Sequence, residues 1–291
     1  MRKPAPKGES SIPAPGLART AYRVGVDRVR LVRFIAVAVA LGAAIVATHQ
    51  PHAGPRDDAH TVATTYPTNA AKIFKWGNAQ WADEFVDPLK AMWSVNRKSQ
   101  VRNQHGMLTL EAPATGGDTI AWLTGHARQY GRWEARVRGR NYGTSGKGYH
   151  AVWELTPTSG YHCGARSIVL SDYALGTTKA AMHVRRLPNR DYTVSKPLGL
   201  TRNQFHTYAI EVTPDHISWF VDTKVIRTER RSGARTGATY NARFRLVGSP
   251  GAKMIPGRMQ MDWVRYYTLD RPNAKPITAP QLTQRTYAGA C

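Results

Sequence analysis

The chain of 291 residues is predicted to be an all-β protein, folded as a two-sheet antiparallel β-sandwich. Proline and glycine are frequent, at 18 and 25 residues, and the sequence contains neither helical heptads nor internal repeats. Apolar and polar residues alternate over residues 206–226 on both sides of the polar turn Thr213–His216, which predicts a β-hairpin. Residues 259–267 show the same period of two. Both segments are therefore expected to be half-buried strands.

The N-terminal part predicts export. Residues 1–33 form a basic region with eight Lys and Arg, and residues 34–48 form an apolar segment whose uncharged run is 14 residues long. That length is short for a spanning helix and typical of a signal-peptide core, whereas the basic region before it is long for a cleaved signal. The segment is thus a signal anchor or a signal peptide. Either way the basic flank should stay in the cytoplasm and the sandwich should be extracytoplasmic, membrane-anchored or secreted.

The rest of the chain divides into three parts. Residues 49–69 read as a linker, residues 70–270 as the single domain, and residues 271–291 as a poorly packed C-terminal tail, because they are rich in Pro, Ala and Thr. The two cysteines are Cys163 and Cys291. An exported protein can join them, but two separate thiols are the alternative, since a terminal residue must be held in place to form a disulfide.

The protein is strongly basic. It has 41 Lys and Arg against 19 Asp and Glu, a net charge of +22, and residues 54–291 alone carry 33 against 17, or +16. Such a field attracts polyanions. Because the protein is exported, anionic wall polymers or lipid headgroups are expected rather than nucleic acid; the alternative is a merely solvated surface. The basic clusters are Arg185 with Arg186, Arg190, the run Arg227–Arg235, and Arg243 with Arg245.

The hairpin and the final strand resemble the C-terminal half of glycoside hydrolase family 16, the laminarinase and lichenase group of β-glucanases. In that family a hairpin of the pattern "HtYaieWtpd.I.wyvDg" precedes a strand of the pattern "M.vDWVRvY". Similar segments occur upstream in the family's order: Trp81–Phe85, His105–Leu110, Tyr130–Val137 and Gly148–Leu155. The resemblance covers about residues 70–270 and implies a concanavalin A-like jelly roll.

The strand that should carry the family's chemistry departs from the pattern. Family members have Glu-x-Asp-x-x-Glu there, whereas this chain reads GARSIVLSDY over residues 164–173. Alignment on Tyr173 places Ser167 at the nucleophile, Val169 at the assisting aspartate and Asp172 at the acid/base position. Two of the three carboxylates are therefore replaced.

This replacement bears directly on activity. A retaining glycosidase needs two carboxyl groups about 5 to 5.5 Å apart. Ser167 is a poor nucleophile without a base to activate it, and Val169 cannot exchange a proton. Asp172 is one methylene shorter than glutamate, and a displacement of about 1 Å can cost on the order of 100-fold in rate. Alternation puts Ser167 and Val169 on one face, so a β-bulge is needed to bring Asp172 to that face.

The resemblance also implies glycan-binding residues. Trp153 and Tyr149 take the places of cleft aromatics that stack on sugars, although an aromatic in a sandwich is more often part of the core. His183 corresponds to a histidine near the reacting sugar, and a structural role is its alternative. Arg166 would either bring a positive charge to the site or pair with Glu154, which needs a partner if it is buried.

The expected chemistry requires no cofactor, but many family members bind one structural calcium. The counterparts of its ligands are Glu84, the backbone carbonyl of Gly106, and Asp262, and oxygen ligands suit calcium. In the alternative reading Glu84 and Asp262 pair with arginines on neighbouring strands.

Three functions follow from these observations. The first is an exported protein that binds a polysaccharide, which may be anionic, with hydrolysis lost or strongly reduced. The second is an active O-glycosyl hydrolase or transglycosylase that uses Asp172 as acid/base; inversion would need Asp118, Asp191 or Glu154 about 6.5 to 9.5 Å away. The third is a basic scaffold that tethers anionic wall polymer or lipid.

Overall fold

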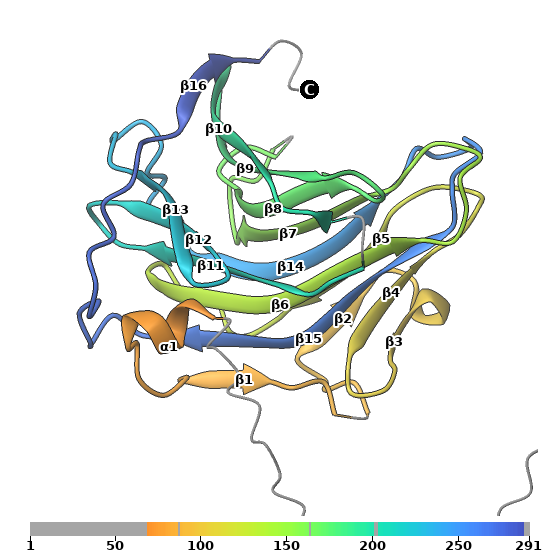
Figure 1. The fold of residues 1–291 in the computed structure, drawn as a ribbon, viewed down its shortest axis with the longest axis horizontal. Coiled ribbons are helices and arrows are strands. Elements are labelled where there is room, and N and C mark those ends of the chain that lie inside the picture. The colour runs from red at the N-terminus through yellow and green to blue at the C-terminus, as the bar shows by residue number, and fades with distance from the viewer. Residues whose placement is uncertain (1–68, 87, 163, 201–202, 288–291) are drawn as a thin grey trace, which may run out of the picture. The chain divides into compact units, whose positions relative to one another are not determined.

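The computed structural model describes residues 69–86, 88–162, 164–200 and 203–287 (Figure 1). The basic N-terminal region, the apolar segment, nearly all of the linker, and both cysteines lie outside the described residues. Within the described part, no helix is long and apolar enough to cross a membrane.

Sheet A is an antiparallel sheet of eight strands. Its central strand β6 lies between β11 and β15, and β1 pairs with β15 outside the main strand order. In spatial order the strands are β13 (Lys224–Glu229), β12 (Ile217–Val221), β11 (His206–Val212), β6 (Gly131–Asn141), β15 (Gly257–Tyr267), β4 (Leu108–Ala112) and β3 (Val101–Asn103), with β1 (Trp81–Asp83) beside β15.

Sheet B is also antiparallel and has eight strands. In spatial order they are β16 (Thr283–Thr286), β10 (Arg190–Pro197), β9 (Lys179–Arg186), β8 (Ile168–Ala174), β7 (His150–Pro157), β14 (Tyr240–Val247), β5 (Thr119–Leu123) and β2 (Trp93–Val95). The inner faces of the two sheets share one apolar core. The predicted two-sheet jelly-roll sandwich is therefore confirmed.

The predicted hairpin is present as β11 and β12, with Tyr208 opposite Val221 and Val212 opposite Ile217. Tyr208 and Ile210 point into the core, because their side chains are fully buried in the shared apolar cluster. The alternation in the sequence thus correctly predicted which side chains of this hairpin face the core.

Two short helices complete the fold: α1 (Ala70–Phe74) and the 3₁₀ helix η1 (Lys98–Gln100). Helix α1 packs on the outer face of sheet A, where Phe74 contacts Phe220. The fully buried Glu134 of β6 accepts hydrogen bonds from the backbone N–H groups of Ala70 and Ala71, at 2.7 and 3.2 Å. This carboxyl group therefore fixes the start of the helix.

The C-terminal segment over residues 271–287 is mostly exposed, as expected for a tail, but it is attached to the domain at several points. Strand β16 pairs with β10 and extends sheet B, and Leu282 is buried in the core. Asn273 donates to both carboxylate oxygens of the buried Glu211, at 2.9 and 3.0 Å. Composition suggested a loose segment, but backbone pairing and a few distant contacts hold it against the domain.

Candidate functional site

Strand β8 carries two of the residues that the resemblance aligns with catalytic positions, Val169 and Asp172, on the outer face of sheet B. Ile168, Leu170 and Tyr173 belong to the core, whereas Val169 and Asp172 do not and face outward. The strand register shifts between Val169 and Asp172, so the predicted β-bulge is present and returns Asp172 to the outer face.

Asp172 is paired with a histidine. Its Oδ1 lies 2.7 Å from Nδ1 of His150 on the adjacent strand β7. Burial opposes the ionisation of Asp172, but the hydrogen bond from His150 and the positive charges nearby outweigh it and lower the pKa of the aspartate. The same hydrogen bond raises the pKa of His150. Asp172 is therefore ionised at neutral pH.

Glu154 is the second carboxylate on this face, and two arginines of β14 neutralise it. Its Oε1 lies 2.8 Å from a terminal nitrogen of Arg243 and 2.7 Å from Nε of Arg245. The proposed Arg166–Glu154 pair is wrong: Arg166 donates to the backbone carbonyl of Ser159, at 3.3 Å. The reason is strand order, since β14 lies directly beside β7 and places Arg243 opposite Glu154.

His183 lies on β9 opposite Val169. Its Nδ1 lies 3.8 Å from Oδ1 of Asp191, and Nε of Arg185 lies 3.7 Å from the same oxygen. Burial, and after it the charge of Arg185, lowers the pKa of His183, so the ring is neutral at neutral pH. Its predicted contact with a glycan stays a prediction.

The two predicted sugar platforms are core residues, and this expectation is wrong. Trp153 is fully buried and stacks on Phe244, with ring centroids 5.7 Å apart. Tyr149 is fully buried and donates to the carbonyl of Pro113, at 2.7 Å. The family alignment was one residue out of phase with the pleat of β7, and a shift of one residue exchanges the two faces of a strand. The charge of Glu154 was the available signal for the outward face.

A cavity of about 460 Å³ lies beside Arg243 on the outer face of sheet B. Sequence reasoning did not identify it, although Trp122 alternates with the core residues Ala121 and Leu123 of β5. Trp122 is partly exposed and supplies the aromatic surface of this cavity. The lining residues are Asn96, Ile120, Trp122, Thr156, Pro157, Thr158, Asn241 and Arg243.

Both the sequence and the fold are similar to those of known proteins. The family model described as Glycosyl hydrolases family 16 matches residues 172–265, and the fold resembles solved structures of that family. The resemblance to glycosyl hydrolases family 16 is confirmed. Among curated proteins, none matches this sequence.

Several of the similar structures are laminarinases with low sequence identity. The laminarinase from Rhodothermus marinus is 19% identical, with a TM-score of 0.56 over 65% of this chain and 96% of its own. The laminarinase catalytic domain from Thermotoga maritima MSB8 is 16% identical, with a TM-score of 0.56 over 67% and 99%. The laminarinase from Flavobacterium sp. UMI-01 is 18% identical, with a TM-score of 0.53 over 66% and 100%. Identities this low support a shared fold.

The family 16 match begins at Asp172, after the two substituted positions. Ser167 precedes β8, and its buried hydroxyl has no hydrogen-bond partner among the described residues. Val169 offers only a buried apolar side chain to the site. The fold thus resembles that of the laminarinases, and the assignment of Ser167 and Val169 to substituted catalytic positions stays a prediction.

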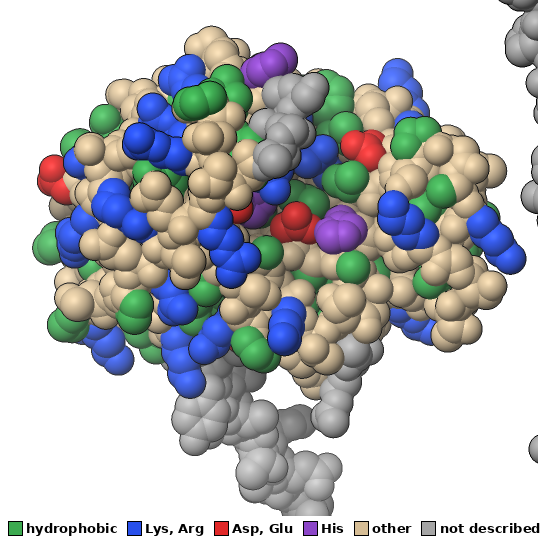
Figure 2. All heavy atoms as spheres, turned by 90° about the horizontal axis from the view of Figure 1, so that it is seen from above, with side chains coloured by type: hydrophobic (Ala, Val, Ile, Leu, Met, Phe, Trp, Pro, Cys, Tyr) green, Lys and Arg blue, Asp and Glu red, His purple; other side chains and the backbone are tan. Residues whose placement is uncertain are grey.

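Four carboxylates on the outer face of sheet B all have basic neighbours. Figure 2 shows acidic and histidine side chains together in a hollow of the face seen from above, surrounded by Lys and Arg. Each of four carboxylates has a basic neighbour: Asp172 has His150, Glu154 has Arg243 and Arg245, Asp191 has His183 and Arg185, and Asp118 has Arg245 at 3.6 Å.

The predicted calcium ligands are already paired. Glu84 forms two hydrogen bonds with Arg265, at 2.9 and 3.1 Å, and Asp262 lies 2.6 Å from Arg136. In the described part of the chain, no three His, Cys, Asp or Glu side chains are grouped as a metal site would need. Glu84 and Asp262 thus form the arginine pairs of the alternative, and the calcium site with Gly106 stays a prediction.

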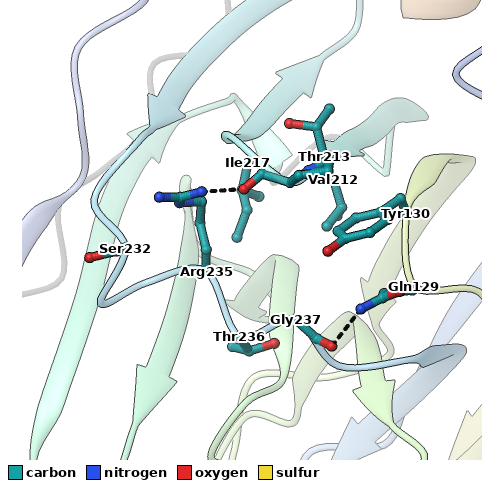
Figure 3. A pocket seen from close by; sticks show the side chains of 10 residues that line it. Gln129, Tyr130, Val212, Thr213, Ile217, Ser232, Arg235, Thr236 and Gly237 are labelled. Carbon is teal, nitrogen blue, oxygen red and sulfur yellow. Dashed lines mark hydrogen bonds between the residues drawn. The ribbon is translucent and has the colours of Figure 1, made fainter.

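A smaller cavity of about 230 Å³ lies between the β11–β12 turn and the loop before β14 (Figure 3). Gln129 donates to the carbonyl of Gly237, at 3.0 Å, and Arg235 donates to the carbonyl of Pro214. No carboxylate or histidine is among its lining residues. This cavity therefore offers no acid or base for glycoside chemistry.

Proposed function

We propose that the protein is an exported family 16 glycoside hydrolase-like protein that binds a polysaccharide on the outer face of sheet B, with hydrolysis lost or strongly reduced. The observation that carries the proposal is the segment of Ser167 and strand β8, in which Ser167, Val169 and Asp172 stand where the resemblance to family 16 implies three carboxylates. A binding face can persist without them, because the scaffold does not depend on the reacting groups.

The nucleophile position cannot act as a nucleophile in this arrangement. A serine hydroxyl attacks an anomeric carbon only when a base removes its proton. The hydroxyl of Ser167 has no hydrogen-bond partner among the described residues, so none of them is placed to do so. Val169 cannot assist, since its side chain is apolar.

Asp172, at the acid/base position, is also in the wrong protonation state for a general acid. A general acid must be protonated near the working pH, and glycosidases achieve this by raising the pKa of a carboxyl group. His150 lowers the pKa of Asp172 instead. The three candidate carboxylates for an inverting reaction have basic neighbours as well: Glu154 binds two arginines, Asp191 has His183 and Arg185 nearby, and Asp118 has Arg245.

The features that remain suit binding. Sugar sites combine an aromatic face with a few convergent polar groups. Trp122 supplies the ring, and Asn96, Asn241 and Arg243 supply donors and acceptors around the same cavity. Because Arg243 beside this cavity is already paired with Glu154, we propose a neutral or weakly charged glycan here, of the β-glucan class that the name of a similar endo-1,3-beta-glucanase gives.

Location outside the cytoplasm is part of the proposal and rests on the sequence. The apolar segment over residues 34–48 and its basic flank support export by an anchor or a cleaved signal. Protease treatment of intact cells tests this directly. Cleavage of the sandwich before the membrane is broken is the expected result, and protection of the sandwich would contradict it.

Affinity electrophoresis against a panel of soluble β-1,3- and mixed-linkage glucans tests the binding face. Trp122→Ala should weaken binding about tenfold or more, since stacking of a ring on an apolar sugar face contributes on the order of 1 kcal/mol or more. Tyr142→Ala is the matched control, because it removes an exposed ring from the other sheet. Equal binding by both variants and the wild type would contradict the assignment of this face.

A further inference from the structure

The outer face of sheet A carries a group of closely spaced arginines. Arg136, Arg138 and Arg140 alternate along β6 with residues that face the core, such as Ala135 and Val137. They therefore all point outward. Arg258 of the neighbouring strand β15 lies directly opposite Arg140 of β6 on one side and directly opposite Glu111 of β4 on the other.

Only some arginines on this face have an acidic partner. Asp262 pairs with Arg136, at 2.6 Å, and Glu111 pairs with Arg102, at 3.3 Å. Three others have no carboxylate within 4.0 Å among the described residues; they are Arg138, Arg140 and Arg258, which we call the arginine row.

The arginine row is electrostatically costly. Like charges directly opposite each other on adjacent strands destabilise a sheet, and Arg140 and Arg258 are such a pair. Burial lowers the pKa of Arg138, and so do the charges of Arg258, Arg136 and Arg140. Nε of Arg258 is buried and has no hydrogen-bond acceptor within the described structure. An anion bound at the exposed ends of these side chains would relieve the repulsion.

Two aromatic rings hold these guanidinium groups in place. Phe205 lies between Arg136 and Arg138, whose guanidinium carbons are 4.4 and 4.3 Å from the ring centroid. Tyr142 lies beside Arg140 and Arg258, at 5.6 and 5.9 Å. Packing against a ring limits the freedom of an arginine side chain while its N–H groups stay available. The row is thus partly organised for a ligand.

We propose that the arginine row binds the phosphate groups of a linear polyanion. Guanidinium forks match the oxygens of phosphate in a bidentate manner. Arg138 and Arg140 are two residues apart on a strand, a separation of about 6.8 Å, so they can engage successive charges of an extended chain. This site is separate from the glycan-binding face and does not depend on the proposed function.

A narrow polymer fits this face better than an anionic membrane. Glu84, Glu111 and Asp262 are partly exposed on the same face, with side-chain exposures of 49, 24 and 31%. A flat anionic surface would approach these carboxylates together with the arginines and would be repelled. A single extended chain can follow the arginine row and avoid them.

Fluorescence anisotropy of labelled inorganic polyphosphate, titrated with the full chain at several salt concentrations, tests the proposal. The double variant Arg140→Gln/Arg258→Gln should bind about tenfold or more weakly and with a smaller salt dependence. The control is Arg190→Gln/Arg285→Gln, which removes the same charge from exposed positions on β10 and β16. It should bind polyphosphate as the wild type does, within about twofold.

Three results would overturn the proposal. Equal weakening in the two double variants would mean that net charge alone attracts the polymer. Unchanged binding in Arg140→Gln/Arg258→Gln would remove the site. Binding to vesicles of anionic lipid, lost in that variant, without binding to polyphosphate would identify a lipid surface instead.

Thermal unfolding shows whether the variant is folded, and its midpoint should not fall, because the substitutions remove a repulsion. Glucan binding on sheet B should be unchanged, which separates this test from that of the proposed function.

Discussion

On the outer face of sheet B four carboxylates each have a basic neighbour, whereas on the outer face of sheet A three arginines have no carboxylate within reach among the described residues. Both faces belong to one sandwich with a continuous core. The net charge of +22 therefore does not locate an anionic ligand by itself. What matters is where positive charge remains uncompensated, and this separates a face suited to a neutral glycan from a face suited to a polyanion.

The largest expected effect tests whether Trp153 belongs to the core or to the binding face. Trp153→Ala should lower the free energy of unfolding by about 3 to 5 kcal/mol, because it leaves a large cavity. Trp122 lies on the outer face of the same sheet, and Trp122→Ala should lower the free energy of unfolding by less than half as much. Urea unfolding measures both. A stable Trp153→Ala protein that no longer binds glucan would return Trp153 to the binding face.

The next largest expected effect is a pH dependence of the free energy of unfolding. It arises from Glu134, which lies on the part of sheet A covered by α1. Burial raises the pKa of Glu134 to about 7, although the N–H groups of Ala70 and Ala71 act in the opposite direction. The folded protein thus holds this proton more tightly than the unfolded chain. The stabilisation is fully present below the unfolded pKa of about 4.5 and is lost as pH rises to about 7, on the order of 3 kcal/mol.

Glu134→Gln is the matched variant, since it keeps the acceptor oxygen and cannot ionise. The difference in unfolding free energy between wild type and variant should change across this pH range, with the wild type becoming relatively less stable as pH rises. Chemical denaturation at pH 4.5, 6 and 7.5 measures it. A difference that is constant with pH would show that Glu134 is ionised in the fold throughout.

A third test compares one carboxylate from each sheet. Glu154→Gln should lower the free energy of unfolding by about 2 kcal/mol, because Arg243 and Arg245 are left largely buried without their counter-ion. Glu84→Gln, which breaks an exposed pair with Arg265, should cost less than about 1 kcal/mol. Equal costs would mean that the two faces do not differ in how strongly they depend on charge pairing.

The smallest expected effect is a change in the pKa of His150. NMR titration should show that the pKa of His150 falls in Asp172→Asn, because the hydrogen bond from that carboxylate raises it. Asp222 follows β12 of the other sheet and lies 3.0 Å from Nδ1 of His206, so Asp222→Asn removes a comparable histidine partner and should leave the pKa of His150 unchanged. If Asp172→Asn has no effect on the titration, Asp172 is not held ionised by this pair, and its role as a proton donor is open again.

The sequence predicted the features that depend on local alternation. The hairpin of β11 and β12 and the bulge before Asp172 follow from which residues must face inward. The face of β7 was misassigned, because a family alignment shifted by one residue exchanges Trp153 with Glu154.

Contacts between distant strands could not be predicted. The pairing of Glu154 with Arg243 spans 89 residues and depends on β7 and β14 being neighbours. The packing of the C-terminal segment has the same origin: Asn273 meets Glu211 across 62 residues. The composition of residues 271–291 carries no record of such contacts, since Pro, Ala and Thr are common in both loose and ordered segments.

The most direct test is the release of reducing ends from β-1,3- and mixed-linkage glucans by the wild-type protein, beside Asp172→Asn. The account predicts little or no release above the buffer control by either protein, because no described residue can activate Ser167 and Asp172 is ionised. Turnover at ordinary glycosidase rates, about 1 to 10³ s⁻¹, that disappears in Asp172→Asn would contradict it.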